Sequence, residues 1–233
     1  MLSPQDVLSY REMCDLYGIS LQRGMNFRIR GDESLILMSV RPGAPYEDRV
    51  EQAGRIVIYE GRDASRYRSG PDPKFVDQPE FQPNGRPTQN GLFIKAVPQY
   101  KSGEAQAERV RIFEKIRDGI WVYNGLFELM DGWQETNERR QVFKFKLQLL
   151  EEILLEPTTP TIRVDFEHDR VIPSAVKVEV WKRDKGRCVE CGSKDNLHFD
   201  HIIPYSQGGF SKDAANIQIL CSRHNLQKRD NIQ

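Results

Sequence analysis

The chain has 233 residues, of which 38% are hydrophobic and 29% are charged, with 34 basic and 34 acidic residues. This length allows one large domain or two modest ones, and the apolar content is sufficient for a hydrophobic core. Zero net charge argues against nucleic-acid binding by bulk charge alone, and no apolar run reaches the roughly 18 residues of a membrane span. Because the N-terminal segment also lacks a signal-peptide core, we expect a cytoplasmic protein with no membrane partner.

The first elements in chain order are a helix and a series of strands. Ser3 and Pro4 have the sequence pattern of a helix start, and Gly18 that of a helix end. Strand-like runs follow at residues 27–30, 34–40, 55–59, 91–97, 108–115, 121–130 and 141–149, and those at 108–115 and 141–149 alternate. Residues 64–90 are rich in Pro, Gly, Asp and Gln and have little periodicity, which is typical of a functional loop.

A break in the pattern divides the chain into two units. Prolines interrupt regular structure at residues 156–160 and again at Pro173. We therefore expect a first domain at residues 1–155, a linker at 156–173 and a second domain at 174–233. A helix over residues 174–184, capped by Ser174 and followed by Gly186, is predicted to open the second domain.

Three of the four cysteines lie in the second unit, in two short metal-ligand pairs. The pairs are Cys188-x-x-Cys191 and Cys221-x-x-His224. A two-residue gap lets a tight turn aim both ligand atoms at one ion, and this ligand set is the type that zinc uses. Since a segment this small has a marginal core, a structural Zn²⁺ is the expected clamp.

The residues between the two pairs include an Asp-His dipeptide. A neutral imidazole such as that of His201 can accept a proton from water near neutral pH. A carboxylate such as that of Asp200 can hold a hard divalent ion. The two residues are adjacent on a predicted strand, so their side chains point to opposite faces unless the strand bends. His198, two positions earlier, is expected to be structural.

The order of these residues resembles the HNH nucleases of the ββα-metal class. The motif runs Asp200-His201-Ile-Ile-Pro-x-Ser-x-Gly-Gly, then Asn216-Ile-Gln-x-Leu-Cys221, then His224-Asn225-x-x-Lys228. The resemblance implies that His201 is the general base and that Asn216 orients the histidine loop. It also implies that Asp200 and Asn225 bind the catalytic ion, Mg²⁺ or Mn²⁺. Lys228 is a candidate phosphate contact, or else a solvated lysine at the helix end.

The first unit is similar to the SRA domain over residues 24–150. The similar fragments include Tyr46-Glu-Asp48, Tyr59-Glu-Gly61 and Trp121-Val-Tyr123-Asn-Gly125. The resemblance implies a curved β-barrel related to PUA domains, which flips 5-methylcytosine or a related base into a pocket. Tyr46 and Tyr59 would stack on the base and Asp48 would read its amino group, with Glu51 as a substitute acid. The alternative for both tyrosines is ordinary barrel packing.

Arginines in the long loop of the first unit suit contact with DNA phosphates. They are Arg62, Arg66, Arg68 and Arg86. The alternative is a solvated loop without a partner.

The sequence therefore predicts an α+β protein, an SRA/PUA-like curved barrel followed by a zinc-clamped ββα-metal domain. We expect a restriction endonuclease that depends on modified cytosine in duplex DNA. Since one HNH site cuts one strand, a homodimer is expected at least on DNA. The alternatives are an HNH endonuclease that recognises unmodified DNA sequence or shape, and a non-catalytic reader of modified DNA.

Overall fold

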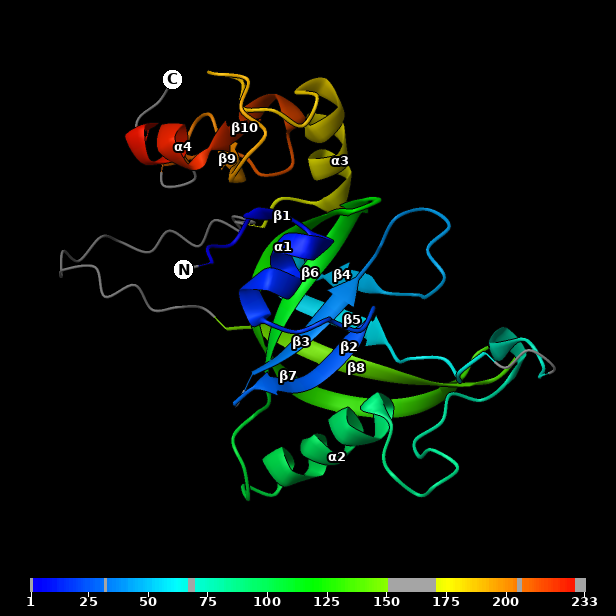
Figure 1. Cartoon of the computed structure of the whole chain (residues 1–233). Helices are drawn as coiled ribbons and strands as arrows, with labels where there is room; N and C mark the ends of the chain where they lie inside the picture. Colours follow the sequence, from blue (N-terminus) through cyan, green and yellow to red (C-terminus); the bar gives the residue numbers. More distant parts are fainter. Residues whose placement is uncertain (1, 32, 67–69, 151–170, 205–206, 229–233) are drawn as a thin grey trace.

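Eight strands form one curved sheet in the first unit (Figure 1). The computed structural model describes residues 2–31, 33–66, 70–150, 171–204 and 207–228. The strand order is β2-β3-β6-β7-β8-β5-β4, with β1 paired to β7, and β3 and β6 pair in parallel. The bounds are β1 (Val7–Ser9), β2 (Met25–Arg30), β3 (Glu33–Met38), β4 (Arg49–Glu51), β5 (Ile56–Glu60), β6 (Arg109–Arg117), β7 (Ile120–Thr136) and β8 (Gln141–Leu149).

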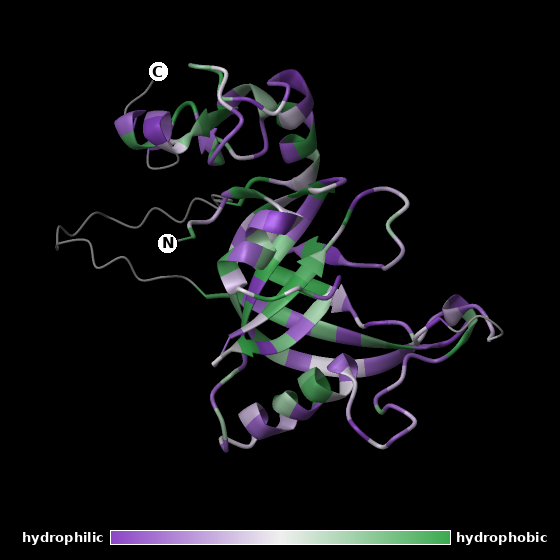
Figure 2. Ribbon diagram, in the orientation of Figure 1, coloured by the Kyte–Doolittle hydropathy of each residue, from purple (hydrophilic) through white to green (hydrophobic). Residues whose placement is uncertain are grey.

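The main core is built by the alternation of apolar residues along these strands. Phe143, Phe145 and Leu147 lie on one face of β8 because successive side chains of a strand point to opposite faces. They join a buried cluster that includes Met25 of β2 and Phe93. Burying one such side chain contributes about 1.5–3 kcal/mol. Hydrophobic residues gather along the central strands, whereas the loops leading away are mostly hydrophilic (Figure 2).

Helix α1 (Tyr10–Tyr17) begins later than the sequence indicates. Ser9 is the N-cap: its Oγ accepts from the Glu12 backbone N at 3.2 Å, and its own N donates to the Glu12 carboxylate at 2.6 Å. This capping box replaces the predicted start at Ser3 and Pro4, because residues 7–9 pair with β7 instead. The predicted end is confirmed, since Gly18 has a left-handed φ of 63°.

Helix α2 (Gln89–Lys101) stands where the sequence predicts a strand at residues 91–97. The Thr88 side chain caps it by accepting from the Gly91 backbone N at 3.2 Å. Phe93 and Val97 lie on one face of the helix and are buried against the sheet. The strand prediction was wrong because a short apolar run fits both periods, and here the cap and the four-residue spacing decide.

The second unit consists of two helices and a hairpin above the sheet (Figure 1). They are α3 (Ser174–Arg183), β9 (Leu197–His201), β10 (Ile217–Cys221) and α4 (Ser222–Lys228); short 3-10 turns lie at η1 (Gln52–Gly54), η2 (Pro73–Phe75) and η4 (Ala214–Asn216). Pro173, not Ser174, holds the N-cap position of α3. The predicted α+β class is confirmed. Within the described residues, no helix has both the length and the apolarity for crossing a membrane.

The two units share a buried junction. A second apolar cluster contains Ile116 and Val122 of the sheet together with Val176 and Val180 of α3. Ile172, at the end of the predicted linker, is 1% exposed and belongs to the same cluster. Residues 156–170 of that linker, like residues 151–155 of the predicted first domain, lie outside the described residues.

A buried ion pair crosses the same junction. Lys177 Nζ of α3 lies 3.0 Å from Glu114 Oε2 of β6 and donates to Asn124 Oδ1 of β7 at 2.7 Å. Asn124 in turn donates to Glu114 at 3.0 Å. Burial by itself raises the pKa of Glu114, but the charge of Lys177 and hydrogen bonds from Ser174, Asn124 and Lys177 outweigh it and lower that pKa.

Candidate metal centre and active site

Three cysteines and a histidine converge at the base of the hairpin. The ligand atoms of Cys188, Cys191, Cys221 and His224 all lie within 4.8 Å of one another. The Cys191 and Cys221 sulfurs are 3.9 Å apart, and His224 Nδ1 is 3.2 Å from Cys188 Sγ and 3.5 Å from Cys221 Sγ. A tetrahedral ion with sulfur bonds near 2.3 Å has ligand atoms about 3.8 Å apart, so the group fits zinc.

Local structure explains how the four ligands meet. Cys188 and Cys191 flank a turn in which the Gly192 N donates to the Cys188 carbonyl at 2.8 Å, with Gly192 at a φ of 73°. Cys221 ends β10, and His224 follows in the first turn of α4. Burial by itself raises the pKa of Cys188, but hydrogen bonds from the Cys221 backbone and the His224 ring outweigh it and lower that pKa to about 6, which favours the thiolate that binds metal.

His201 ends β9 at the end of the hairpin where the connecting loop begins. It pairs with Ile217 across the hairpin, and its Nε2 lies 2.8 Å from the buried Ser211 Oγ. Asp200 pairs with Gln218, the next residue of β10. Its carboxylate faces α4, where Lys228 Nζ lies 2.9 Å from Oδ2. The two neighbours therefore have different surroundings, a buried hydroxyl for the imidazole and a helix for the carboxylate.

Asn216 ties together the loop that follows His201. Its Oδ1 accepts from the Ile203 N at 2.8 Å, and its Nδ2 donates to the carbonyls of Ile203 and Phe210 at 3.3 Å each. Gly209 passes so close that a Cβ there would lie 1.9 Å from the Ile203 oxygen and 2.8 Å from Asn216 Nδ2. Gly209 is a site residue that the sequence reasoning did not single out, although the Gly-Gly pair of the motif is its signal.

The last predicted residues of this site lie on α4. Asn225 follows His224 directly and is partly buried. Lys228 has a side chain that is 1% exposed, and its Nζ also donates to the His201 carbonyl. In this arrangement the partners of the ammonium are the Asp-His dipeptide itself, and a phosphate contact of Lys228 stays a prediction.

The three residues of the predicted base pocket are brought together, but in unequal surroundings. Tyr59 is 2% exposed and belongs to the main core. Burial raises its pKa well above the ordinary value, and the nearby charges of Asp48 and Tyr46 raise it further. The ring of Tyr46 is half-buried, with Lys74 Nζ 3.9 Å from its centroid. Burial, aided by Asp63, raises the pKa of Tyr46 to about 12.

Asp48 is the acid of this group, and it is half-buried. Its two oxygens accept from the Glu60 N at 3.0 Å and the Ser39 N at 3.1 Å. Burial raises the pKa of Asp48 to about 6 despite these hydrogen bonds. Glu51, the substitute acid, instead pairs at the surface with Arg49 at 2.7 Å. The two acids therefore differ in their partners, and the base-reading role of Asp48, with Glu51 as a substitute, stays a prediction.

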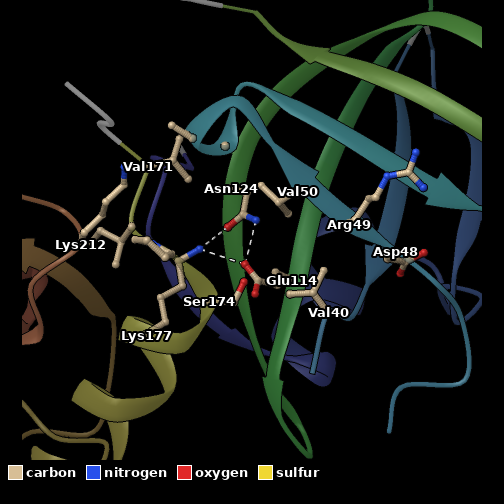
Figure 3. Close-up of a pocket in the computed structure, with 14 residues that line it drawn as sticks. Val40, Asp48, Arg49, Val50, Glu114, Asn124, Val171, Ser174, Lys177 and Lys212 are labelled. Carbon is tan, nitrogen blue, oxygen red and sulfur yellow. Dashed lines mark hydrogen bonds and ion pairs between the residues drawn. The ribbon is translucent and has the colours of Figure 1, made fainter. Parts of the chain in front are cut away.

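A cavity connects Asp48 with the junction of the two units. It has a volume of about 370 Å³, and its lining includes Asp48 and Arg49 from the sheet and Lys177 and Lys212 from the second unit. Figure 3 shows the Lys177 amine pointing to Glu114 and Asn124 at one side of this cavity, with Asp48 at some distance beyond Val50. The candidate base-reading acid thus lies on a hollow shared with the second unit.

A charged network beside the pocket has no counterpart in the sequence predictions. Glu60, which follows Tyr59, is buried and lies 3.1 Å from Lys144 Nζ and 3.4 Å from Arg140. Arg140 also pairs with Asp63 at 2.6 Å. Buried charges need partners of opposite charge, and the acids and bases of this network supply them to each other. In the sequence, the signal for this charged network is the single acid Glu60 after the apolar run of β5.

The predicted DNA-contact arginines differ in exposure. Arg66 is largely exposed and lies 3.6 Å from Asp72, and Arg86 is exposed on the same long loop. Arg62 is bound at both ends: its backbone N donates to Asn90 at 2.7 Å and its guanidinium to Gln22. Arg68 lies outside the described residues.

This clamped hairpin and helix, with an Asp-His pair at the hairpin's end, has the parts of a phosphodiester-cutting site. Residues 188–231 match the family model described as HNH endonuclease. The second unit is therefore an HNH endonuclease domain, as the sequence predicts, and enzymes of this kind depend on a metal. A comparison with curated proteins finds no match.

Three of the solved structures that this chain is similar to are the following. The SUVH5 SRA complex with hemimethylated CG DNA is 24% identical, covering 69% of this chain and 94% of that one, with a TM-score of 0.45. The modification-dependent TagI restriction endonuclease is 18% identical, covering 97% and 76%, with a TM-score of 0.43. The DNA modification-dependent restriction endonuclease AspBHI is 18% identical, covering 60% and 67%, also with a TM-score of 0.43.

Proposed function

We propose that the protein is a modification-dependent restriction endonuclease, which binds 5-methylcytosine or a related modified cytosine in duplex DNA and cuts nearby. The observation that carries the proposal is the union of two sites on one body. An HNH endonuclease domain docks through a buried core on the first unit, which holds two tyrosines and a half-buried acid. A nuclease that reads a base needs both a cutting site and a pocket for that base.

Cleavage is assigned to the end of the hairpin. His201 would accept a proton from the attacking water, and Ser211, 2.8 Å from Nε2, fixes the ring. Asp200 and Asn225 would hold Mg²⁺ or Mn²⁺, since carboxylate and amide oxygens suit hard divalent ions. Such an ion, when bound, supplies charge neutralisation at the phosphate. Asn216 holds the loop after His201, and Zn²⁺ in the four-ligand clamp would hold the hairpin to α4.

Base reading is assigned to the first unit. A flipped cytosine would stack on Tyr46 and Tyr59, and its amino group would donate to Asp48. Because Tyr59 is enclosed in the core, stacking of a base on its ring would require the residues around it to move apart. Phosphate contacts are assigned to the loop arginines. They are Arg62, Arg66, Arg68 and Arg86.

Double-strand cleavage would need two copies of the protein. Each chain carries one HNH segment, and one such site cuts one strand. We infer a homodimer at least on DNA. Sedimentation with and without a modified duplex would report this, and a strictly monomeric complex that linearises a plasmid in one encounter would refute it.

The test uses duplexes that are identical except for cytosine, 5-methylcytosine or 5-hydroxymethylcytosine at one position. We expect cleavage of a modified duplex with Mg²⁺ or Mn²⁺, none with a chelator, and none by His201→Ala. His198→Ala is the matched control, because His198 lies on the same strand but contacts Asp6 and Ser222 at the junction. It should still cut.

Each alternative function has its own outcome in this test. Equal cutting of modified and unmodified duplexes would contradict base reading and favour an endonuclease of sequence or shape. Binding of the modified duplex without cutting under any metal would favour a non-catalytic reader. Undiminished cutting by His201→Ala would remove its assignment as the base.

A further inference from the structure

The side chain of Lys228 is enclosed at the HNH site. It ends the described part of α4, its side chain is 1% exposed, and its ammonium has two partners, Asp200 Oδ2 at 2.9 Å and the His201 carbonyl. Lysine is almost never fully buried unless it is paired. The charge of Lys228 is therefore committed to the Asp-His dipeptide.

Asp200, by contrast, is open to solvent on one side. Its side chain is 19% exposed. Gln218 Nε2 lies 3.4 Å from the same oxygen that Lys228 contacts. A carboxylate with a buried cation on one oxygen and an exposed edge can be approached by a second cation from solvent. The Lys228 ammonium thus stands in for a metal ion and shows that the position accepts positive charge.

Two cations on one carboxylate repel each other, and the repulsion is strong where water is excluded. A divalent ion that binds Asp200 must therefore displace the Lys228 ammonium from the carboxylate. The energy needed to break this ion pair lowers the affinity of Asp200 for metal.

We propose that Lys228 is an internal counter-ion of Asp200, which occupies the carboxylate before a divalent ion enters and sets how tightly that ion binds. Lys228 is a positioning residue in this role, because it holds Asp200 and the His201 backbone against α4. The inference rests on the proposed function, since it takes Asp200 as the ligand of the catalytic ion.

The first experiment titrates Mn²⁺ into zinc-loaded protein by calorimetry. Lys228→Met and Lys228→Gln remove the charge at similar length, and Lys228→Arg retains it. We expect Met and Gln to bind Mn²⁺ roughly tenfold more tightly or better, a change of about 1.4 kcal/mol, and Arg to bind like wild type. Asp200→Asn should abolish this binding in every background. Circular dichroism and zinc content confirm that each variant is folded.

The second experiment uses the wild-type chain and so does not depend on a variant that folds. Acetic anhydride labels accessible amines, and mass spectrometry reports each lysine. We expect Lys228 to be protected without a divalent ion and labelled several-fold more with Mg²⁺. The exposed Lys182 on α3 should be labelled equally in both.

The outcomes separate the two proposals. Unchanged or weaker Mn²⁺ binding by both neutral variants, or labelling of Lys228 that Mg²⁺ does not change, would overturn the counter-ion role and leave the nuclease intact. An affinity for Mn²⁺ that Asp200→Asn leaves unchanged would overturn both the counter-ion role and the assignment of Asp200 as a metal ligand.

Discussion

Replacing Lys177 with methionine should destabilise the protein strongly, because it breaks the buried pair that joins α3 to the sheet. The side chains of Lys177 and Glu114 are 0% and 2% exposed, with 3.0 Å between Nζ and Oε2. At an effective dielectric constant of about 20 their attraction is about 5–6 kcal/mol, much of which offsets desolvation. Removing one partner strands the other, which costs about 3–5 kcal/mol, a large share of a typical stability of about 5–15 kcal/mol.

Urea unfolding followed by tryptophan fluorescence and circular dichroism measures this loss. Lys182→Met, an exposed lysine on the same helix, is the matched control and should change stability by less than about 0.5 kcal/mol. The double variant Lys177→Met, Glu114→Gln should lose at least about 2 kcal/mol less stability than the sum of the losses in the two single variants. A Lys177→Met loss below about 1 kcal/mol, or strictly additive effects, would refute the reasoning.

Three further predictions concern the clamp, the histidine loop and the pocket acid. Cys191→Ser or a zinc chelator should unfold the second unit, because structural zinc supplies about 10–16 kcal/mol in small domains; unchanged circular dichroism would contradict this. Gly209→Ala should lower cleavage about 100-fold at normal zinc content, since its Cβ would lie 1.9 Å from the Ile203 oxygen. The pKa of Asp48 is raised to about 6, so the folded state holds a proton that the unfolded state, with a pKa near 3.9, releases. The free energy of unfolding should therefore rise by roughly 1 kcal/mol from about pH 7.5 to about pH 5, relative to Asp48→Asn, and parallel profiles would argue against it.

Strong local periodicity is what made the strands predictable. The strands β6, β7 and β8 have nine residues or more, long enough for a clear strand signal, and the sequence places all three. β1 and β4 have three residues each, too few for a periodic signal. The segment now in α2 is apolar but short, and its helical period emerges when Phe93 and Val97 face the sheet.

Residue type and spacing by themselves determined the chemistry of the second unit. Two ligand pairs with two-residue gaps indicate a metal clamp. Within each pair, the two residues between the ligands are too few to place the ligand atoms far apart. The Asp200-His201 motif likewise names the parts of a nuclease before any coordinates are known.

Only the tertiary structure decided which charges those parts meet. The partners of Lys177 and Asp200 come from distant segments, Glu114 and Lys228, so no local pattern announces them. Asp48 and Glu51 also look alike in the sequence, but Asp48 accepts from the backbone N of Ser39 and Glu60, whereas Glu51 pairs with Arg49 at the surface. The physical reason is that Coulomb energy and desolvation depend on distance and solvent exposure, which exist only once the chain has folded.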